Sequence, residues 1–186
     1  MKKIWSHTSI LAGLLFLASC SVSKIYFVRH AEKSLEVKTD PPLTPEGEFR
    51  AEELARLLGN KKIKKIYSTE TKRTQHTGKP LADKLGIFIQ NYSMDTMPKF
   101  LFHVLRDGQN SLIIGHSNTI IPMLKELELN PSVNEISDQE YDNLFIVSLK
   151  PHDGRSGYKM QLKETKFGKA SPKSPIPGRN TMMDSR

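Results

Sequence analysis

The sequence predicts an α/β protein, a three-layer α/β/α sandwich built around a mostly parallel central sheet. Between residues 24 and 168, short β-rich runs alternate with longer stretches that have helical periodicity. Glycine, proline and asparagine separate these segments, as turns and helix ends require. Strands that are joined through helices pair in parallel, and the helices then cover both faces of the sheet.

The first strand and the first helix have the clearest boundaries. Lys24–Val28 (KIYFV) is rich in β-branched and aromatic residues and ends at Arg29-His30. Thr44-Pro45 begins a helix, with threonine as N-cap and proline as the first helical residue. Gly59-Asn60 ends that helix. Its apolar residues have helical spacing: Ala51, Leu54, Ala55 and Leu58.

The remaining elements continue the alternation. Gly86 ends the second helix, and Asp153-Gly154 with Ser156-Gly157 predict a turn between the last two strands. We expect strands at Ile63–Ser68, Ile87–Gln90, Ser111–Gly115, Leu144–Leu149 and Tyr158–Lys166, and helices at Thr71–Leu85, Pro98–Arg106 and Ser117–Leu127.

Composition excludes several classes of protein. The 186 residues include 28 Lys+Arg, 20 Asp+Glu and one cysteine, for a formal net charge of +8. A chain of this length fits one domain, and its composition excludes disorder throughout, a collagen-like repeat and a disulfide scaffold. No basic face interleaved with aromatic residues accompanies the charge, so we expect no nucleic-acid partner.

The N-terminus has the pattern of an export signal. Lys2 and Lys3 precede the apolar run Ile10–Ala18 (ILAGLLFLA), which is shorter than the roughly 20 residues that span a bilayer. Leu17–Cys20 (LASC) resembles the lipobox of bacterial lipoproteins, in which the cysteine receives a lipid and becomes the new N-terminus. Ser21 after the cysteine favours an outer-membrane destination facing the periplasm.

These patterns divide the chain into four parts: a signal peptide (1–19), a lipid anchor with a short linker (20–23), one domain (24–168) and a disordered basic tail (169–186). The tail has three prolines and no periodicity. Loss of the signal removes two lysines and no acid, and the tail accounts for a further +3 of the +8. The domain itself is therefore nearly neutral.

Reactive side chains follow three of the predicted strands. Arg29–Lys33 follows the first, Ser68–Arg73 the second, and His116–Thr119 comes after the buried run Ser111–Gly115. The carboxyl ends of parallel strands meet at one edge of the sheet, where α/β proteins bind ligands. Two histidines and two arginines beside a helix N-terminus suit a phosphate group, because arginines bind it in bidentate fashion and the helix end carries positive partial charge.

Four motifs resemble the histidine phosphatase (phosphoglycerate mutase-like) superfamily, in the order expected of that family. They are RHAEK at 29–33, LTPEG at 43–47, YSTETKRTQHT at 67–77 and IIGHSNTI at 113–120. The resemblance covers roughly residues 24–167. It implies a phosphoglycerate mutase-like fold and a metal-independent phosphatase that forms a phosphohistidine intermediate.

The resemblance also implies roles for individual residues. His30 matches the nucleophile, whose imidazole must be neutral in order to attack phosphorus. Arg29, Arg73 and His116 match the phosphate pocket, and Ser117 and Asn118 begin the helix whose backbone N–H groups face it.

The family places the general acid between the second arginine motif and the last histidine, where Asp95 follows a strand and lies on a loop. Glu32, two residues beyond the nucleophile, is the alternative, and the assignment stays open. No set of side chains has metal-ligand spacing, so we expect no metal and no cofactor.

Hydrolysis of phosphomonoesters outside the cytoplasm is the main functional hypothesis, with a small phosphorylated molecule or an exposed phosphoprotein as the substrate. A noncatalytic lipoprotein that binds phosphorylated ligands or an envelope partner is the alternative from another class. A phosphomutase is disfavoured because the short domain leaves little room for a pocket that retains its intermediate. Specificity would come from Lys33 and from the loops at 34–42 and 91–100, whose sequences do not identify a substrate.

Overall fold

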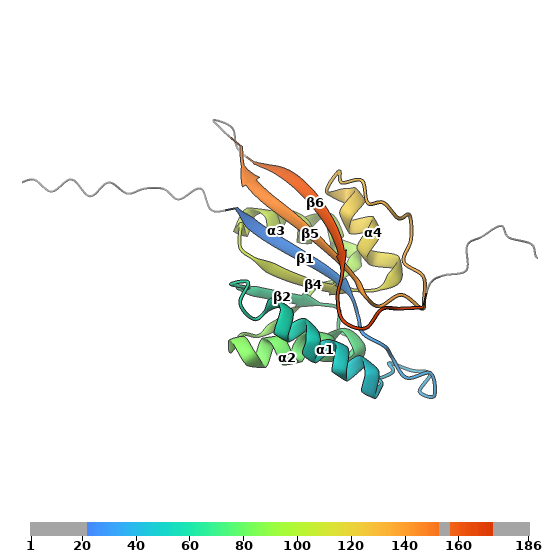
Figure 1. Ribbon diagram of the computed structural model, residues 1–186. Coiled ribbons are helices and arrows are strands. Elements are labelled where there is room, and N and C mark those ends of the chain that lie inside the picture. Colours follow the sequence, from blue (N-terminus) through green and yellow to red (C-terminus); the bar gives the residue numbers. More distant parts are fainter. Residues whose placement is uncertain (1–21, 153–156, 173–186) are drawn as a thin grey trace, which may run out of the picture.

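A computed structural model describes residues 22–152 and 157–172. A six-stranded sheet in the order β3-β2-β4-β1-β5-β6 forms its centre (Figure 1). The first four strands of that order pair in parallel. Strand β5 pairs antiparallel with β1, and β6 pairs antiparallel with β5. The strands are β1 (Ser23–Arg29), β2 (Lys65–Ser68), β3 (Ile89–Asn91), β4 (Ser111–Gly115), β5 (Asn143–Pro151) and β6 (Tyr158–Lys166).

Helices cover both faces of this sheet, which confirms the predicted three-layer α/β class. Figure 1 shows α1 (Pro45–Leu58) and α2 (Lys72–Leu85) on one face. The other face carries α3 (Met97–Asp107) and α4 (Ser117–Glu126). Within the described residues the structure adds a short element that the sequence did not indicate, a 3₁₀ turn, η1 (Met94–Thr96), directly before α3.

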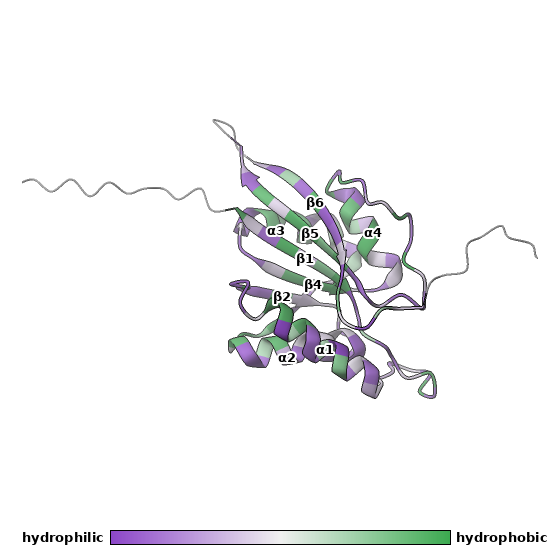
Figure 2. Cartoon of the chain, in the orientation of Figure 1, coloured by the Kyte–Doolittle hydropathy of each residue, from purple (hydrophilic) through white to green (hydrophobic). Residues whose placement is uncertain are grey.

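Two apolar clusters hold the layers together, one on each face of the sheet. Alternation along β1 separates them: Ile25 and Phe27 pack on the side of α3 and α4, while Tyr26 and Val28 pack on the side of α1 and α2. All five residues of β4 are buried, as expected of a central parallel strand. Figure 2 shows the hydrophobic residues along β1, between the two layers of helices.

The helix boundaries follow from local chemistry. Thr44 Oγ1 accepts a hydrogen bond from the Gly47 amide at 3.2 Å, so threonine caps α1 as expected. Gly86 ends α2 in the left-handed region at φ 64°, which favours glycine. The second strand begins at Lys65 rather than at Ile63, because the chain still turns at Lys62, where φ is 55°.

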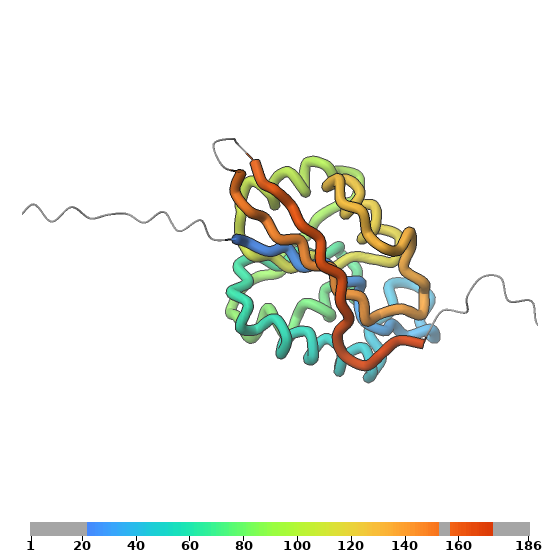
Figure 3. The backbone as a smooth tube through the Cα atoms, turned by 45° about the horizontal axis from the view of Figure 1, so that its top comes forward, coloured from blue at the N-terminus to red at the C-terminus, as the bar shows by residue number. Residues whose placement is uncertain are grey.

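The folded domain continues beyond its predicted end at Gly168. The segment Phe167–Pro172, hereafter the C-terminal strap, runs from the end of β6 toward the start of α1 (Figure 3). Arg50 of α1 donates to the carbonyl oxygens of Phe167 (3.1 Å) and Lys169 (2.9 Å). The Ser171 amide donates to Asp142 at 3.0 Å. These contacts could not be predicted from the sequence, because the segment has the composition of a linker and binds through backbone groups that any sequence supplies.

Several predictions fall outside the described residues. The signal peptide, Cys20 and Ser21 precede Val22, the turn at 153–156 is excluded, and the tail beyond Pro172 is not described. Among the residues that are described, no helix has the length and apolar character needed to cross a membrane.

The strap predicts different effects for two truncations. A chain that ends at Gly168 loses the bonds of Lys169 and Ser171, and we expect it to unfold with a free energy about 2–4 kcal/mol lower, at roughly 1 kcal/mol per bond. A chain that ends at Pro172 keeps these bonds and serves as the control. Urea unfolding followed by circular dichroism measures both, and equal midpoints would show that the strap contributes nothing to stability.

Candidate active site

The register of the sheet brings the two predicted site histidines together. Arg29 at the end of β1 lies opposite Gly115 at the end of β4 in the parallel ladder. The next residues, His30 and His116, therefore leave the sheet side by side, with ring centroids 5.4 Å apart in an edge-on arrangement. Their position is the carboxyl edge of the parallel strands, where the sequence placed them.

His30 is buried, and its ring is fixed by backbone groups. Its Nδ1 lies 2.7 Å from the carbonyl oxygen of Ala31. Because a carbonyl only accepts, Nδ1 carries the proton and Nε2 keeps a free lone pair. The Ala31 amide donates to Thr77 Oγ1 at 2.9 Å and the His30 amide to the Gly115 carbonyl at 2.9 Å, so the turn after β1 is held on both sides.

His116 has the opposite tautomer. Arg73 donates from a terminal nitrogen to its Nδ1 at 3.3 Å, so this nitrogen is an acceptor. The Nε2–H group consequently donates to Thr69 Oγ1 at 2.9 Å. The His116 amide donates to Thr119 Oγ1 at 2.7 Å, which begins α4 directly after the strand.

Gly115 permits this close arrangement. A Cβ atom at this position would lie 2.5 Å from Thr119 Oγ1 and 3.0 Å from the Tyr92 hydroxyl. Both atoms have fixed partners, because Thr119 caps α4 and the Tyr92 hydroxyl donates to the Ile114 carbonyl at 3.1 Å. Any larger residue would therefore displace the turn that carries His116.

Arg29 is buried, with 2% of its surface exposed. One terminal nitrogen donates to the carbonyls of Ser137 (2.7 Å) and Glu140 (3.1 Å), and the other reaches Asp138 Oδ1 at 3.4 Å. The guanidinium lies 4.3 Å from the centre of the Tyr141 ring. Arg29 is thus clamped by the loop before β5, while its Nε is buried without a partner among the described residues.

Arg73, in the first turn of α2, approaches His116 from the side of β2. Its closest carboxylate is that of Asp40, 4.0 Å from the second terminal nitrogen, and its Nε also has no hydrogen-bond partner in the described part of the chain. Two guanidinium groups thus lie beside the two histidines, and each has an Nε–H donor without a partner in the described residues. An oxyanion is the chemical group that would use these donors.

Burial, reinforced by the nearby positive charges, keeps both imidazoles neutral. Burial, followed by the nearby charge of Arg29, lowers the pKa of His30 to about 3. Burial and then Arg73 lower the pKa of His116 to about 4. A neutral imidazole with its lone pair on Nε2 is the form that attacks phosphorus, so the environment holds His30 in the nucleophilic state at neutral pH.

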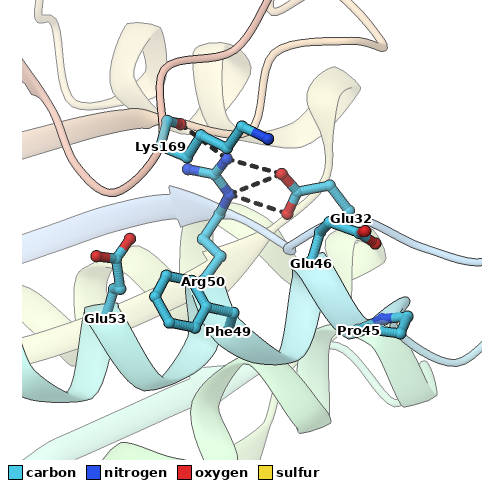
Figure 4. A pocket seen from close by; sticks show the side chains of 7 residues that line it. All are labelled: Glu32, Pro45, Glu46, Phe49, Arg50, Glu53 and Lys169. Carbon is cyan, nitrogen blue, oxygen red and sulfur yellow. Dashed lines mark hydrogen bonds and ion pairs between the residues drawn. The ribbon is translucent and has the colours of Figure 1, made fainter.

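The structure gives Glu32 a buried partner. Its carboxylate accepts three bonds from Arg50, at 2.7, 2.9 and 3.0 Å, and Arg50 is only 4% exposed (Figure 4). Arg50 also binds the C-terminal strap, so this pair joins the segment after His30 to α1 and to the end of the domain. Such placement favours a positioning role for Glu32 over proton donation.

Within the described residues, the other predicted ones form no hydrogen bond or ion pair with His30 or with the site arginines. Asp95 is exposed on η1, where its Oδ2 accepts from Ser93 Oγ at 3.2 Å. Ser117 Oγ donates to Asp138 Oδ1 at 3.2 Å, and Asn118 is exposed on the first turn of α4.

The sequence did not single out three residues that contact the site arginines. Asp138 and Tyr141 hold Arg29, and Asp40 lies beside Arg73. Asp138 belongs to an acidic stretch, 138–142, directly before β5, and this stretch was the available signal. Asp40 has φ 45° in the loop between β1 and α1, but its sequence context (TDPP) indicates only a turn.

No group of three or more His, Cys, Asp or Glu side chains in the described residues could hold a metal ion. The donors that converge here are arginine and imidazole nitrogens, a set that suits an oxyanion rather than a cation.

Comparison with known proteins agrees with this geometry. Residues 25–98 match the sequence model of the histidine phosphatase superfamily (branch 1). No curated protein sequence matches the chain significantly. This match covers less than half of the chain, from β1 to the start of α3.

Three of the solved structures with a similar fold are phosphatases by name. A mycobacterial glucosyl-3-phosphoglycerate phosphatase aligns with a TM-score of 0.61 at 11% identity, over 76% of this chain and 97% of its own. The protein histidine phosphatase SixA, solved with tungstate, gives 0.57 at 17%, over 77% and 96%. Phosphoserine phosphatase of Entamoeba histolytica, solved with 3-phosphoglyceric acid, gives 0.53 at 14%, over 80% and 98%. At these identities the alignments show the fold alone.

The lowered histidine pKa values predict that acid destabilises the protein. Between about pH 6.5 and pH 4 the unfolded chain binds protons on His30 and His116 that the folded chain does not, so stability falls as pH falls through this window. From pH 7 to pH 5 each histidine should cost about 2 kcal/mol.

Urea unfolding at both pH values measures this loss, and His30→Asn should reduce it. His76→Asn is the control, because His76 is exposed on α2. Identical pH dependence in His30→Asn and the unmodified protein would contradict the assignment of a buried neutral imidazole.

Proposed function

We propose that this protein is a phosphatase that hydrolyses phosphomonoesters through a phosphohistidine on His30, and that it acts outside the cytoplasm. The observation that carries the proposal is the pairing of a buried neutral His30, whose Nε2 is free, with two arginines that retain unused donors. The superfamily match over residues 25–98 supports the same chemistry.

In the first step Nε2 of His30 attacks phosphorus, and the bond from phosphorus to the leaving oxygen breaks. The Nδ1–H bond to the Ala31 carbonyl fixes the ring and stabilises the positive charge that forms on it. Arg29 and Arg73 offset the negative charge on the phosphoryl oxygens. His116 positions the Arg73 guanidinium through its Nδ1, while its Nε2–H is held by Thr69. The leaving oxygen takes a proton from a carboxylic acid.

In the second step water attacks phosphorus, the P–N bond breaks, and the same carboxylate takes the proton from water. Asp95 is the candidate from sequence, and Asp40 and Asp138 join it because they lie against the site arginines. Loss of the true acid would slow alkyl phosphates, which have a poor leaving group, more than p-nitrophenyl phosphate.

We further propose that a lipid on Cys20 anchors the protein to the bacterial envelope. β1 begins at Ser23, three residues after this cysteine, and runs from the anchor point to Arg29. His30 follows at the far end of the strand, so the site lies at the opposite edge of the sheet from the N-terminus. An anchor at Cys20 is therefore compatible with a site that faces away from the membrane.

A comparison of His30→Ala with His76→Ala tests the catalytic proposal. We expect His30→Ala to lower kcat for p-nitrophenyl phosphate by at least about 10³-fold, because the covalent route is lost. His76→Ala should retain full activity, since His76 is exposed on α2. Equal hydrolysis by both variants would contradict the proposal and favour a noncatalytic phosphate-binding lipoprotein.

A second comparison tests the anchor. In a Gram-negative host, Cys20→Ala should move the protein from the membrane to the soluble fraction, because the thiol that receives the lipid is gone. Ser21→Ala is the matched control and should stay with the membrane. Unchanged fractionation of Cys20→Ala would rule out lipidation at this residue.

A further inference from the structure

A cavity of about 610 Å³ lies beside the candidate active site. Three segments form its walls: the chain after β1 with the start of α1, the loop before β5, and the C-terminal strap. The lining residues are Glu32, Lys33, Leu35, Thr44, Glu46, Arg50, Asp138, Gln139, Tyr141, Lys169, Ala170, Ser171 and Pro172. None of the four proposed catalytic or phosphate-binding side chains (Arg29, His30, Arg73 and His116) belongs to this lining.

Two residues connect the cavity with the site. Tyr141 lines the cavity, and its ring centre is 6.0 Å from that of His30. Asp138 also lines the cavity and contacts Arg29 at 3.4 Å. When the phosphoryl group of a substrate is bound at His30, the remainder of that substrate can therefore reach into the cavity.

The back of the cavity is rigid. The ion pair of Glu32 and Arg50 forms part of its lining, and Arg50 also donates to the Lys169 carbonyl in the strap. Figure 4 draws these contacts in a neighbouring pocket that shares Glu32, Glu46, Arg50 and Lys169. The Tyr141 amide donates to Ser171 Oγ at 2.8 Å, which fixes the loop before β5 against the same strap. A preformed cavity of this size is typical of a site for a small molecule or a side chain rather than a surface irregularity.

The charges of the lining balance. Glu32, Glu46 and Asp138 are matched by Lys33, Arg50 and Lys169. The cavity thus gives no net attraction to a second anionic group, in contrast to the phosphate pocket with its two arginines. A substrate whose leaving group carries a carboxylate or another phosphate would gain nothing here.

The remaining surface of the cavity is largely apolar. It includes the Tyr141 ring, Ala170, Pro172 and Leu35, whose side chain is 85% exposed. A leucine so exposed gains nothing from the core of the protein itself, and contact with a bound apolar group would remove it from water. The ring of Tyr141, together with the aliphatic side chains of the lining, suits an aromatic group.

We propose that this cavity binds the leaving group of the substrate and selects aryl phosphates, the class that includes phosphotyrosine, over small anionic phosphate esters. The proposal rests on the proposed phosphatase function and adds its substrate class. Leu35 is then a specificity-determining residue that does not take part in the chemical steps.

Leu35→Ser tests the proposal, and Val37→Ser is the matched control. Val37 lies on the same loop, is 45% exposed and does not line the cavity. Each full-length chain also carries Cys20→Ala so that it is recovered without detergent, and kcat/KM is measured for 1-naphthyl phosphate and for glycerol 3-phosphate.

Leu35→Ser should lower kcat/KM for 1-naphthyl phosphate about three- to tenfold and leave that for glycerol 3-phosphate unchanged. Val37→Ser should change neither value. Equal changes for the two substrates, or no change in Leu35→Ser, would overturn the proposal.

Binding of (1-naphthyl)methylphosphonate and of methylphosphonate to His30→Ala, measured by calorimetry, separates this proposal from the phosphatase function. Tighter binding of the naphthyl compound, weakened by Leu35→Ser, would support the cavity even if no ester is hydrolysed. If the protein with His30 hydrolyses esters but His30→Ala binds the two compounds equally, the cavity proposal is rejected and the phosphatase proposal stands.

Discussion

The site depends on two guanidinium groups, Arg29 buried and Arg73 partly buried, that lie next to two neutral imidazoles. Burial of Arg29 lowers its pKa from the ordinary value, which shows that the folded chain bears a cost for keeping this charge away from water. Burial, together with the same charges, lowers the pKa values of His30 and His116 and keeps both imidazoles neutral. A bound phosphate dianion would relieve this excess of positive charge, so the structure is organised around a ligand that carries negative charge.

The fold supplies the support that such a cluster requires. Parallel pairing of β1 with β4 sets the two histidines side by side, and Thr77 and Thr119 fix the turns that carry them. The loop before β5 holds Arg29 at the sheet edge through two carbonyl oxygens. Glu32, Arg50 and the C-terminal strap then connect this loop with the segment after His30, so the walls of the site are held by bonds that lie outside it.

Sequence patterns predicted the fold and the central histidines because these features depend on local signals. Capping residues such as Thr44 and Gly86 mark helix ends, and buried runs that end in polar residues mark the carboxyl edge. The partner of Glu32 could not be predicted, because Arg50 is 18 positions away on a helix with an ordinary pattern. Asp138 and the strap were missed for the same reason: their contacts join segments whose composition is that of loops.

Detection of the covalent intermediate tests the central claim most directly. The Nδ1 bond of His30 to Ala31 leaves Nε2 as the atom that attacks, so rapid alkaline quenching during turnover of p-nitrophenyl phosphate, followed by peptide mass spectrometry and ³¹P NMR, should find one phosphoryl group on His30 at Nε2. His30→Ala should carry none. Turnover without a phosphorylated His30, or a phosphoryl group on a different residue of the active protein, would contradict the account.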